Sequence, residues 1–231
     1  MPVVATHLMD GGSNSAPSLT YTTASVSVPA GYLMLFSVSS DTNAVLPTIS
    51  GLGVTWTQVA SGSGGTNNWD VTTFRALSLS PLSGTITITF SSTTSLDDVA
   101  WMLDIFQNVD QSGTGGANAI VQTATNSGSS TTSLTVTLAA FSSADNATFG
   151  AMVVNGTSDI TPGSGFTELN ENDASSRTTQ TQFKNTNDTG VDWSWSGNQS
   201  VGGLAIELKY SAVDLTKIGG SPMFFDTVAI G

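Results

Sequence analysis

Residues 85–106 read TITITFSSTTSLDDVAWMLDIF and hold more apolar surface at period two than any other stretch of this length. Two sets of apolar residues recur there at every second position: Ile86, Ile88 and Phe90, then Trp101, Leu103 and Ile105. Apolar residues at alternate positions are typical of a strand with one buried face. The stretch therefore predicts two strands that form a hairpin-like unit.

Composition extends this interpretation to the whole chain. Charged residues make up 10% of the 231 residues, whereas about a quarter is usual in soluble domains. The polar surface must therefore come from Ser, Thr, Asn and Gly, which disfavour helix interiors and suit strands and tight turns. The chain is also long enough to bury a full-sized core. We predict an all-β fold.

The charge balance excludes some partners. The formal net charge is −12, and only five residues are basic: Arg75, Arg177, Lys184, Lys209 and Lys217. Binding to nucleic acid needs Lys and Arg to neutralise phosphates, and five scattered residues form no patch. We therefore expect neither direct nucleic-acid binding nor adsorption to anionic membranes. The acidity favours solubility.

No cysteine is present, which excludes disulfides, thiolate metal sites and thiol catalysis. Residues 1–12 (MPVVATHLMDGG) lack a basic region followed by a long apolar run, and no window approaches the length of a membrane-spanning helix. We expect a protein that is made and assembled in the cytoplasm, or one whose leader was removed before residue 1.

Strand-like segments before residue 109 recur in the same order after residue 119. The matched pairs include Trp56 with Phe166, Phe74 with Phe183, Arg75 with Lys184, Phe90 with Trp195, and Asp104 with Glu207. An ordered series of this kind indicates an internal repeat. We predict a two-sheet, jelly-roll-like β-sandwich over 1–210, built from tandem halves at about 1–109 and 119–210 whose packing covers exposed strand edges. Two separate sandwiches in tandem are the alternative.

The strand pattern stops after Tyr210. Residues 211–231 form a C-terminal arm in which a Gly-Gly-Ser-Pro break precedes five large apolar residues: Met223, Phe224, Phe225, Val228 and Ile230. We predict that these five bind a partner, by adding a strand or filling a groove on a neighbouring subunit. Folding back onto the chain's own sandwich and disorder are the alternatives.

The residues that carry chemistry are few. His7 is the one histidine, it lies in a predicted strand, and no nucleophile motif accompanies it, so no catalytic site is expected. Asp104 and Glu207 resemble the carboxylate pair of a glycosidase. Because Arg75 and Lys184 recur with them, we predict a cross-strand or cross-sheet ion pair in each half instead. Unrelated surface charges are the alternative.

Calcium is the one cofactor for which the sequence offers ligands, since it binds through oxygen atoms alone. Suitable oxygens occur at residues 170–175 (NENDAS), at 185–192 (NTNDTGVD) and at Asp97 and Asp98, which we expect to be loops. None of these segments has the spacing of a dedicated calcium loop. Solvated turns are the favoured interpretation.

Glycan binding would need an exposed aromatic platform. Trp193 and Trp195 align with the core positions Ile88 and Phe90, and Trp56 also matches an inward residue, so we predict that all three are buried. Trp69 has no counterpart and lies in the predicted loop SGSGGTNNWD. It is the candidate ligand platform.

Six motifs together resemble β-sandwich domains of structural proteins from tailed bacteriophages: GVTWTQV (53–59), TTFRAL (72–77), TITITF (85–90), WMLDIF (101–106), GSGFTEL (163–169) and GNQSVGGLAIELK (197–209). The resemblance implies a virion role, as a capsid decoration or tail surface subunit without catalytic residues. It implies partners that are copies of the chain or other virion subunits. A lectin-like module and a subunit of an extracellular filament are the alternatives.

Overall fold

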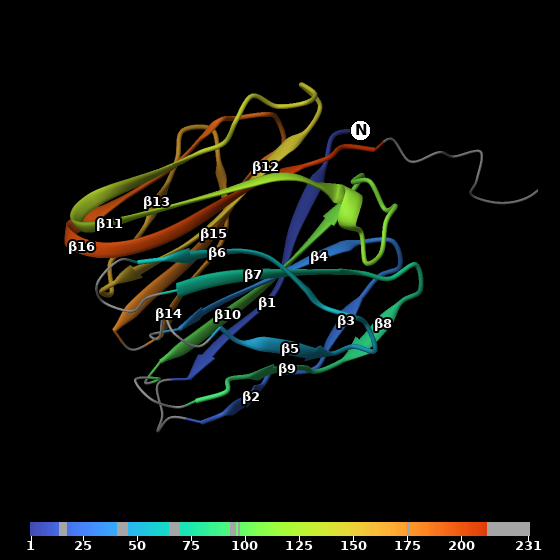
Figure 1. Cartoon of the computed structure of the whole chain (residues 1–231), viewed down its shortest axis with the longest axis horizontal. Coiled ribbons are helices and arrows are strands. Elements are labelled where there is room, and N and C mark those ends of the chain that lie inside the picture. Colours follow the sequence, from blue (N-terminus) through green and yellow to red (C-terminus); the bar gives the residue numbers. More distant parts are fainter. Residues whose placement is uncertain are drawn as a thin grey trace, which may run out of the picture.

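The computed structural model describes residues 1–13, 18–40, 46–64, 70–92, 96, 98–174 and 176–211. Regular structure in these ranges consists of strands and one short 3-10 turn, η2 (Ala117–Ala119), in the junction between the halves. All strands that share a sheet pair antiparallel with their neighbours (Figure 1). The predicted all-β sandwich fold is confirmed.

The first half contains β1 (Val4–Ser13), β2 (Thr20–Thr22), β3 (Val26–Val28), β4 (Leu33–Ser40), β5 (Thr48–Gly51), β6 (Thr57–Ser63), β7 (Asp70–Leu77), β8 (Leu82–Gly84), β9 (Ile86–Thr89) and β10 (Val99–Gln107). Its large sheet has the order β1-β10-β4-β7-β6. The outer layer consists of the sheet β2-β9-β5 and the pair β3-β8. The chain thus crosses repeatedly between the two layers.

The second half contains β11 (Ile120–Thr137), β12 (Ala147–Asn155), β13 (Thr161–Pro162), β14 (Thr167–Ala174), β15 (Arg177–Lys184) and β16 (Gly190–Leu208). Its sheet has the order β11-β16-β12-β15-β14, and β13 pairs with β16. The long strands β11 and β16 curve from the large sheet into the outer layer (Figure 1). Residues 126–132, although rich in Ser, Thr and Gly, lie inside β11.

The two large sheets have the same strand order when the halves are compared. β1, β10, β4, β7 and β6 correspond to β11, β16, β12, β15 and β14. This topological match supports the predicted duplication. The boundaries 1–109 and 119–210 remain a proposal.

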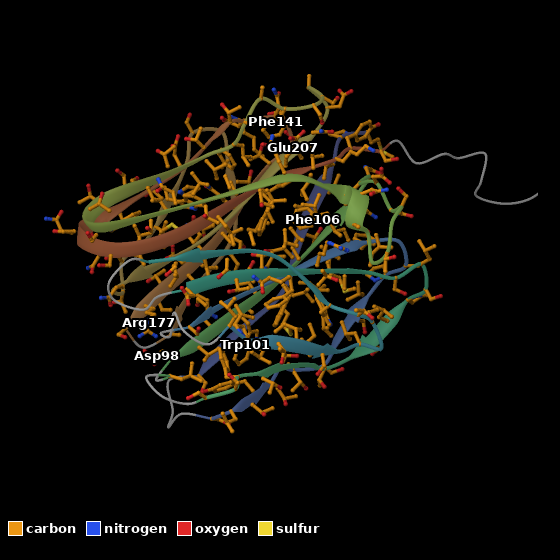
Figure 2. The ribbon with its side chains drawn as sticks, viewed as in Figure 1. Asp98, Trp101, Phe106, Phe141, Arg177 and Glu207 are labelled. Atoms are coloured by element: carbon orange, nitrogen blue, oxygen red, sulfur yellow. The ribbon has the colours of Figure 1, made fainter. Side chains whose placement is uncertain are left out.

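Three buried clusters separate four layers of strands. One fills the first sandwich and includes Phe36 and Ile88, and another fills the second sandwich and includes Trp193. The third, called the inter-sheet cluster, lies between the two large sheets and includes Phe106 (Figure 2). Phe106 packs edge-on against Phe149. Both faces of the central strands are therefore covered, which explains the nearly continuous apolar sequences of β4, β10 and β12.

The two large sheets pack face to face in opposite order. β1 lies over β14 at one edge, and β6 lies over β11 and β16 at the other. Backbone meets backbone at the second edge, where a Cβ added to Gly62 would lie 2.4 Å from the carbonyl oxygen of Gly203. Glycine at these positions permits the close approach.

The hairpin-like pairing predicted for residues 85–106 is wrong. β9 pairs with β2 and β5, whereas β10 pairs with β1 and β4 in the other layer. Both segments are strands with the predicted alternation, but they face each other across the core of the first sandwich.

The residue match between Asp104 and Glu207 is also wrong in one respect. The two acids hold equivalent positions in the strand pairing, but they point to different layers. Leu35, opposite Asp104, belongs to the inter-sheet cluster, so Asp104 faces the other half. Ile206 belongs to the same cluster, so Glu207 faces the second sandwich, because successive side chains alternate. A shift of one residue exchanges the faces of a strand.

Candidate functional site

The predicted partner-binding residues and the predicted ligand platform lie outside the described residues: Met223, Phe224, Phe225, Val228, Ile230 and Trp69. The structure does describe where each segment begins. The arm begins at Ser211, its one described residue, and Trp69 precedes Asp70, the first residue of β7.

The root of the arm, residues 208–211, is bound to the junction between the halves. Tyr210 forms an antiparallel bridge with Val109, and the Ser211 amide donates to the Asn108 carbonyl at 3.0 Å. The Asn108 side-chain amide donates to the carbonyl of Pro2 at 2.8 Å. The N-terminal segment, the junction and the arm root therefore meet at one end of the molecule.

An ion pair supports the same root. Lys209 Nζ lies 2.8 Å from Asp110 Oδ2, and the Ser112 amide donates to Asp110 Oδ1 at 2.9 Å. The hydrogen bond from Lys209, followed by those from Ser112, lowers the pKa of Asp110 to about 2. The Lys209 amide also donates to the carbonyl of Ala119 at 2.8 Å. The arm thus starts from a firmly bound residue.

Glu207 lies behind the root and is fully buried. Its Oε1 accepts from Asn146 Nδ2 at 2.5 Å and from the Ser142 amide at 3.1 Å, and its Oε2 accepts from Gln122 Nε2 at 2.6 Å. Asn146 Oδ1 in turn accepts from the Tyr210 amide at 3.0 Å. The position of Glu207 is shown in Figure 2. One carboxylate therefore joins β11, the segment before β12 and the arm root, an arrangement that sequence reasoning missed.

A pocket of about 340 Å³ opens beside the root. Met1, Pro2, Asp145 and Tyr210 line it. Its lining combines apolar surface with one carboxylate, that of Asp145.

The predicted ion pair between Arg75 and Asp104 is wrong. Arg75 Nη1 donates to the carbonyls of Thr114 at 2.9 Å and Gly115 at 2.6 Å, so it fixes the junction. Asp104 is fully buried, and its Oδ1 lies 2.9 Å from Nδ1 of His7. Sequence reasoning missed this partner because the pairing of β1 with β10 is a long-range contact.

The pKa values of His7 and Asp104 are both raised. Burial raises the pKa of Asp104, while hydrogen bonds with His7 and Thr181 oppose the rise. Burial lowers the pKa of His7, but contacts with Asp104 and then Asp10 outweigh it, so the net shift is upward. Nε2 of His7 is buried and lies 3.5 Å from Oδ1 of Asp10. The pair fits a structural role within β1 and β10.

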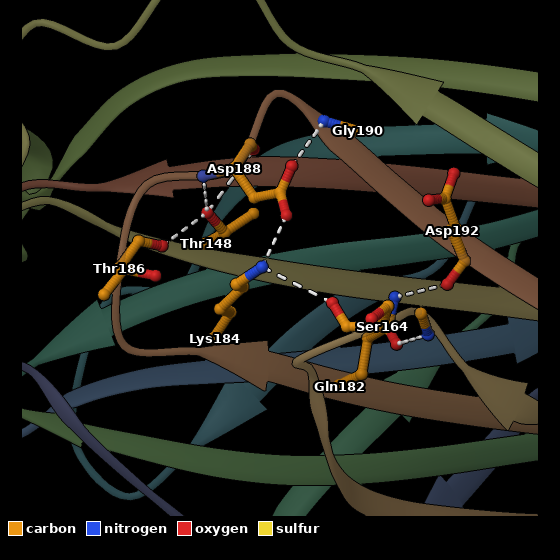
Figure 3. A network of polar contacts seen from close by, with 9 residues as sticks. Thr148, Ser164, Gln182, Lys184, Thr186, Asp188, Gly190 and Asp192 are labelled. Carbon is orange, nitrogen blue, oxygen red and sulfur yellow. Dashed lines mark hydrogen bonds and ion pairs between the residues drawn. The ribbon is translucent and has the colours of Figure 1, made fainter.

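The predicted pair between Lys184 and Glu207 is wrong as well. Lys184 Nζ lies 2.7 Å from Oδ2 of Asp188, whose Oδ1 accepts from the Gly190 amide at 3.0 Å (Figure 3). The Asp188 amide donates to Oγ1 of Thr148 at 3.0 Å. The carboxylate of Asp188 is therefore occupied by contacts within the 185–190 turn and with Lys184.

The other segments that offered oxygen ligands for calcium also differ from expectation. Residues 167–174 are the edge strand β14, so most of the predicted 170–175 loop is a strand. Asp98 forms an ion pair with Arg177 at 3.2 Å, and Asp97 lies outside the described residues. Among the described residues, no group of three or more His, Asp and Glu side chains is placed to bind a metal.

Aromatic residues offer no exposed platform in the described ranges. Trp193 and Trp195 are buried in the second sandwich, as predicted, and Trp101 is buried in the first. Trp56 is partly buried against Phe36, with ring centroids 5.8 Å apart. The glycan hypothesis therefore depends on Trp69.

Comparison of the chain with family models, curated proteins and solved structures finds no match. Within the described ranges, no helix has the length and apolarity to cross a membrane. Function must therefore be argued from the residues themselves.

Proposed function

We propose that the chain is a non-enzymatic structural subunit of a phage-like virion, a capsid decoration or tail surface protein, which assembles through its C-terminal arm. The observation that supports this is the arm root. Tyr210 and Ser211 are bonded to the junction between the halves, so the arm begins at a fixed place on the body. The resemblance of its motifs to phage β-sandwich domains supports a role in a virion.

The arm sequence has the chemistry of a docking segment. Its five large apolar residues follow a Gly-Gly-Ser-Pro break that separates them from the root. Burial of one such side chain contributes roughly 1.5–3 kcal/mol. Docking of several on a neighbouring subunit therefore offsets the loss of freedom that assembly entails.

Removal of residues 212–231 tests the proposal, and retaining Ser211 preserves its bond to Asn108. The full chain should form oligomers by light scattering, whereas the truncated chain should be a monomer with an unchanged far-ultraviolet circular dichroism spectrum and melting temperature. A full-length variant with Phe224→Ser and Phe225→Ser serves as a matched control and should also lose assembly. If the truncated chain has the same mass distribution as the full chain, the arm is not the assembly element.

A further inference from the structure

The two sides of the molecule at which sheet edges stack differ in charge. On one side β1 lies over β14, and these two strands carry Asp10, Glu168, Glu171 and Asp173. The side-chain amide of Asn172 donates to Asp10 Oδ2 at 2.7 Å and joins the two strands. On the other side β6 lies over β11, and neither strand contains a charged residue. In a chain of net charge −12, this second side, called the uncharged edge, is where an apolar strand can approach without meeting a carboxylate on the edge strands.

β11 is an open strand at the uncharged edge. Among the described residues, it pairs with β16 and with no strand on its other side. Its register with β16 is regular from Gln122 to Gly128, whereas bulges interrupt β1, β6 and β14. Native proteins usually protect an edge strand with charges, proline or bulges. The regular part of β11 has none of these, so it can accept a further strand.

Side chains close the part of this edge that lies in the outer layer. The Gln122 side chain accepts from the amide of Ala139 at 3.0 Å and donates to its carbonyl at 3.1 Å. Asn126 Nδ2 donates to the carbonyl of Thr135 at 2.8 Å, and Asn126 Oδ1 accepts from the Ser127 amide at 2.9 Å. The open segment is therefore the part of β11 in the large sheet, from Gln122 to Asn126.

A strand added to the open segment would extend an apolar layer. Thr123 and Thr125 expose their side chains there, and Val121 beside them is 38% exposed. Thr123 pairs with Ile206, a member of the inter-sheet cluster, so both lie on the same face of the sheet. Apolar side chains of an added strand would continue that cluster outward past Val121.

The arm root lies at the start of this edge. The Lys209 amide donates to the carbonyl of Ala119, the residue before β11. Residues 212–231 follow the root, and a chain of this length can extend over about 70 Å. The open segment and the equivalent segment of a neighbouring copy are both within that reach when two copies meet at their uncharged edges.

The arm sequence suits an uncharged edge. In an extended conformation, residues 223–230 have one face without charge, formed by Met223, Phe225, Thr227 and Ala229. Asp226 is the one charged residue after Lys217, and it lies on the opposite face. Such a segment would be repelled by the acidic strands β1 and β14 but not by β11.

The direction of the arm selects between copies. The arm leaves the body at the beginning of β11, so it can follow its own β11 only in the same direction, as a parallel strand. The arm of a copy related by a two-fold axis runs the opposite way and meets β11 antiparallel. Antiparallel pairing is slightly more stable per residue, and all described sheets use it.

We propose that the edge of β11 from Gln122 to Asn126 accepts residues 223–230 of a neighbouring copy's arm as an antiparallel strand. Backbone hydrogen bonds to the open edge supply affinity, and the apolar face of the arm supplies specificity. This inference rests on the proposed function, because it names the surface on which the arm docks.

Hydrogen exchange of the full chain tests the docking surface. Above the concentration at which light scattering detects assembly, amides within 122–126 should exchange at least tenfold more slowly than in the dilute monomer, whereas those of β14 should not change. The variant with Phe224→Ser and Phe225→Ser should show no slowing at either concentration. Equal protection at all concentrations would show that each arm covers its own β11, which overturns the inference.

The failure of this inference is distinguishable from that of the proposed function. If the chain truncated after Ser211 assembles as the full chain does, the proposed function is wrong. If assembly requires the arm but leaves residues 122–126 unprotected, only the docking surface is wrong.

Variants at the exposed Thr123 provide a second test. Thr123→Lys and Thr123→Glu should each raise the dissociation constant of assembly at least tenfold, because either charge loses hydration when a strand covers it. Both should keep the circular dichroism spectrum of the wild type. Thr167→Lys, at an exposed position of β14, is the matched control and should assemble normally. Normal assembly of both Thr123 variants, or an effect of the Glu variant alone, contradicts strand addition at β11.

Discussion

Arg177 of β15 forms an ion pair with Asp98, just before β10, with Nη1 3.2 Å from Oδ2 and side-chain exposures of 4% and 8% (Figure 2). Ser176 Oγ adds a hydrogen bond to the same carboxylate oxygen at 3.0 Å. The pair joins the two halves at one edge of their interface. Because both charges are buried, each depends on the other.

Removal of one member should therefore be costly. Breaking a buried pair typically costs about 3–5 kcal/mol, because the remaining charge stays buried without its partner. Asp98→Ala should lower the free energy of unfolding by about 3 kcal/mol, measured by urea denaturation. The double variant Asp98→Ala, Arg177→Met should recover part of the loss. A loss below about 1 kcal/mol in the single variant contradicts this view of the pair.

The close contact of β6 with β16 gives a second prediction. A Cβ at Gly62 would lie 2.4 Å from the Gly203 carbonyl oxygen, so the sheets must separate locally. Gly62→Ala should cost roughly 1–3 kcal/mol, as overpacking usually does, measured by thermal and urea denaturation. Gly190→Ala is the control, since its nearest contact would be 3.9 Å away. Equal stability of the two variants would show that the sheets tolerate a wider spacing.

The arm root gives a prediction at acid pH. The folded pKa of Asp110 is about 2, below the ordinary value of 3.8. A carboxyl with a lowered folded pKa stabilises the protein above its unfolded pKa, and this contribution is lost as pH falls toward the folded value. The melting temperature of the wild type should exceed that of Asp110→Asn at pH 5, and the gap should close between pH 4 and 2. A constant gap across this range would exclude the ion pair as its cause.

The His7–Asp104 pair predicts the opposite pH dependence, a loss of stability as pH rises. Both pKa values are raised in the folded state, so the folded protein holds protons more tightly than the unfolded chain. Stability from His7 is then present below its unfolded pKa of 6.5 and is lost as pH rises through the folded value. The wild type should therefore lose melting temperature as pH rises above 6.5. His7→Gln should reduce that slope, and an identical slope in both proteins would refute the assignment.

The sequence identified strands better than it identified their partners. Alternation at Ile86, Ile88 and Phe90 depends on one buried face, a local property, and the structure confirms it. The partner of β9 depends on residues about 40 to 70 positions away, which period-two patterns do not encode. The predicted hairpin failed for that reason.

The burial of side chains was likewise easier to predict than the partners of charged side chains. Apolar counterparts such as Trp193 were assigned to the core correctly, because burial of a large apolar residue needs no specific partner. Charged residues were assigned to the wrong partners, since Arg75, Lys184 and Glu207 are satisfied by backbone groups and turn residues that vary between the halves. The repeat predicted which segments of the two halves correspond, whereas the layer that a side chain faces depends on a register accurate to one residue.

The position of Tyr210 has a mechanical consequence. Tyr210 follows β16, and β16 is hydrogen-bonded to β11 on one side and β12 on the other. A load on the arm is therefore transmitted into a central strand, where many ladder hydrogen bonds resist sliding together rather than opening one by one. A strand at the edge of the sheet would peel away under a smaller force.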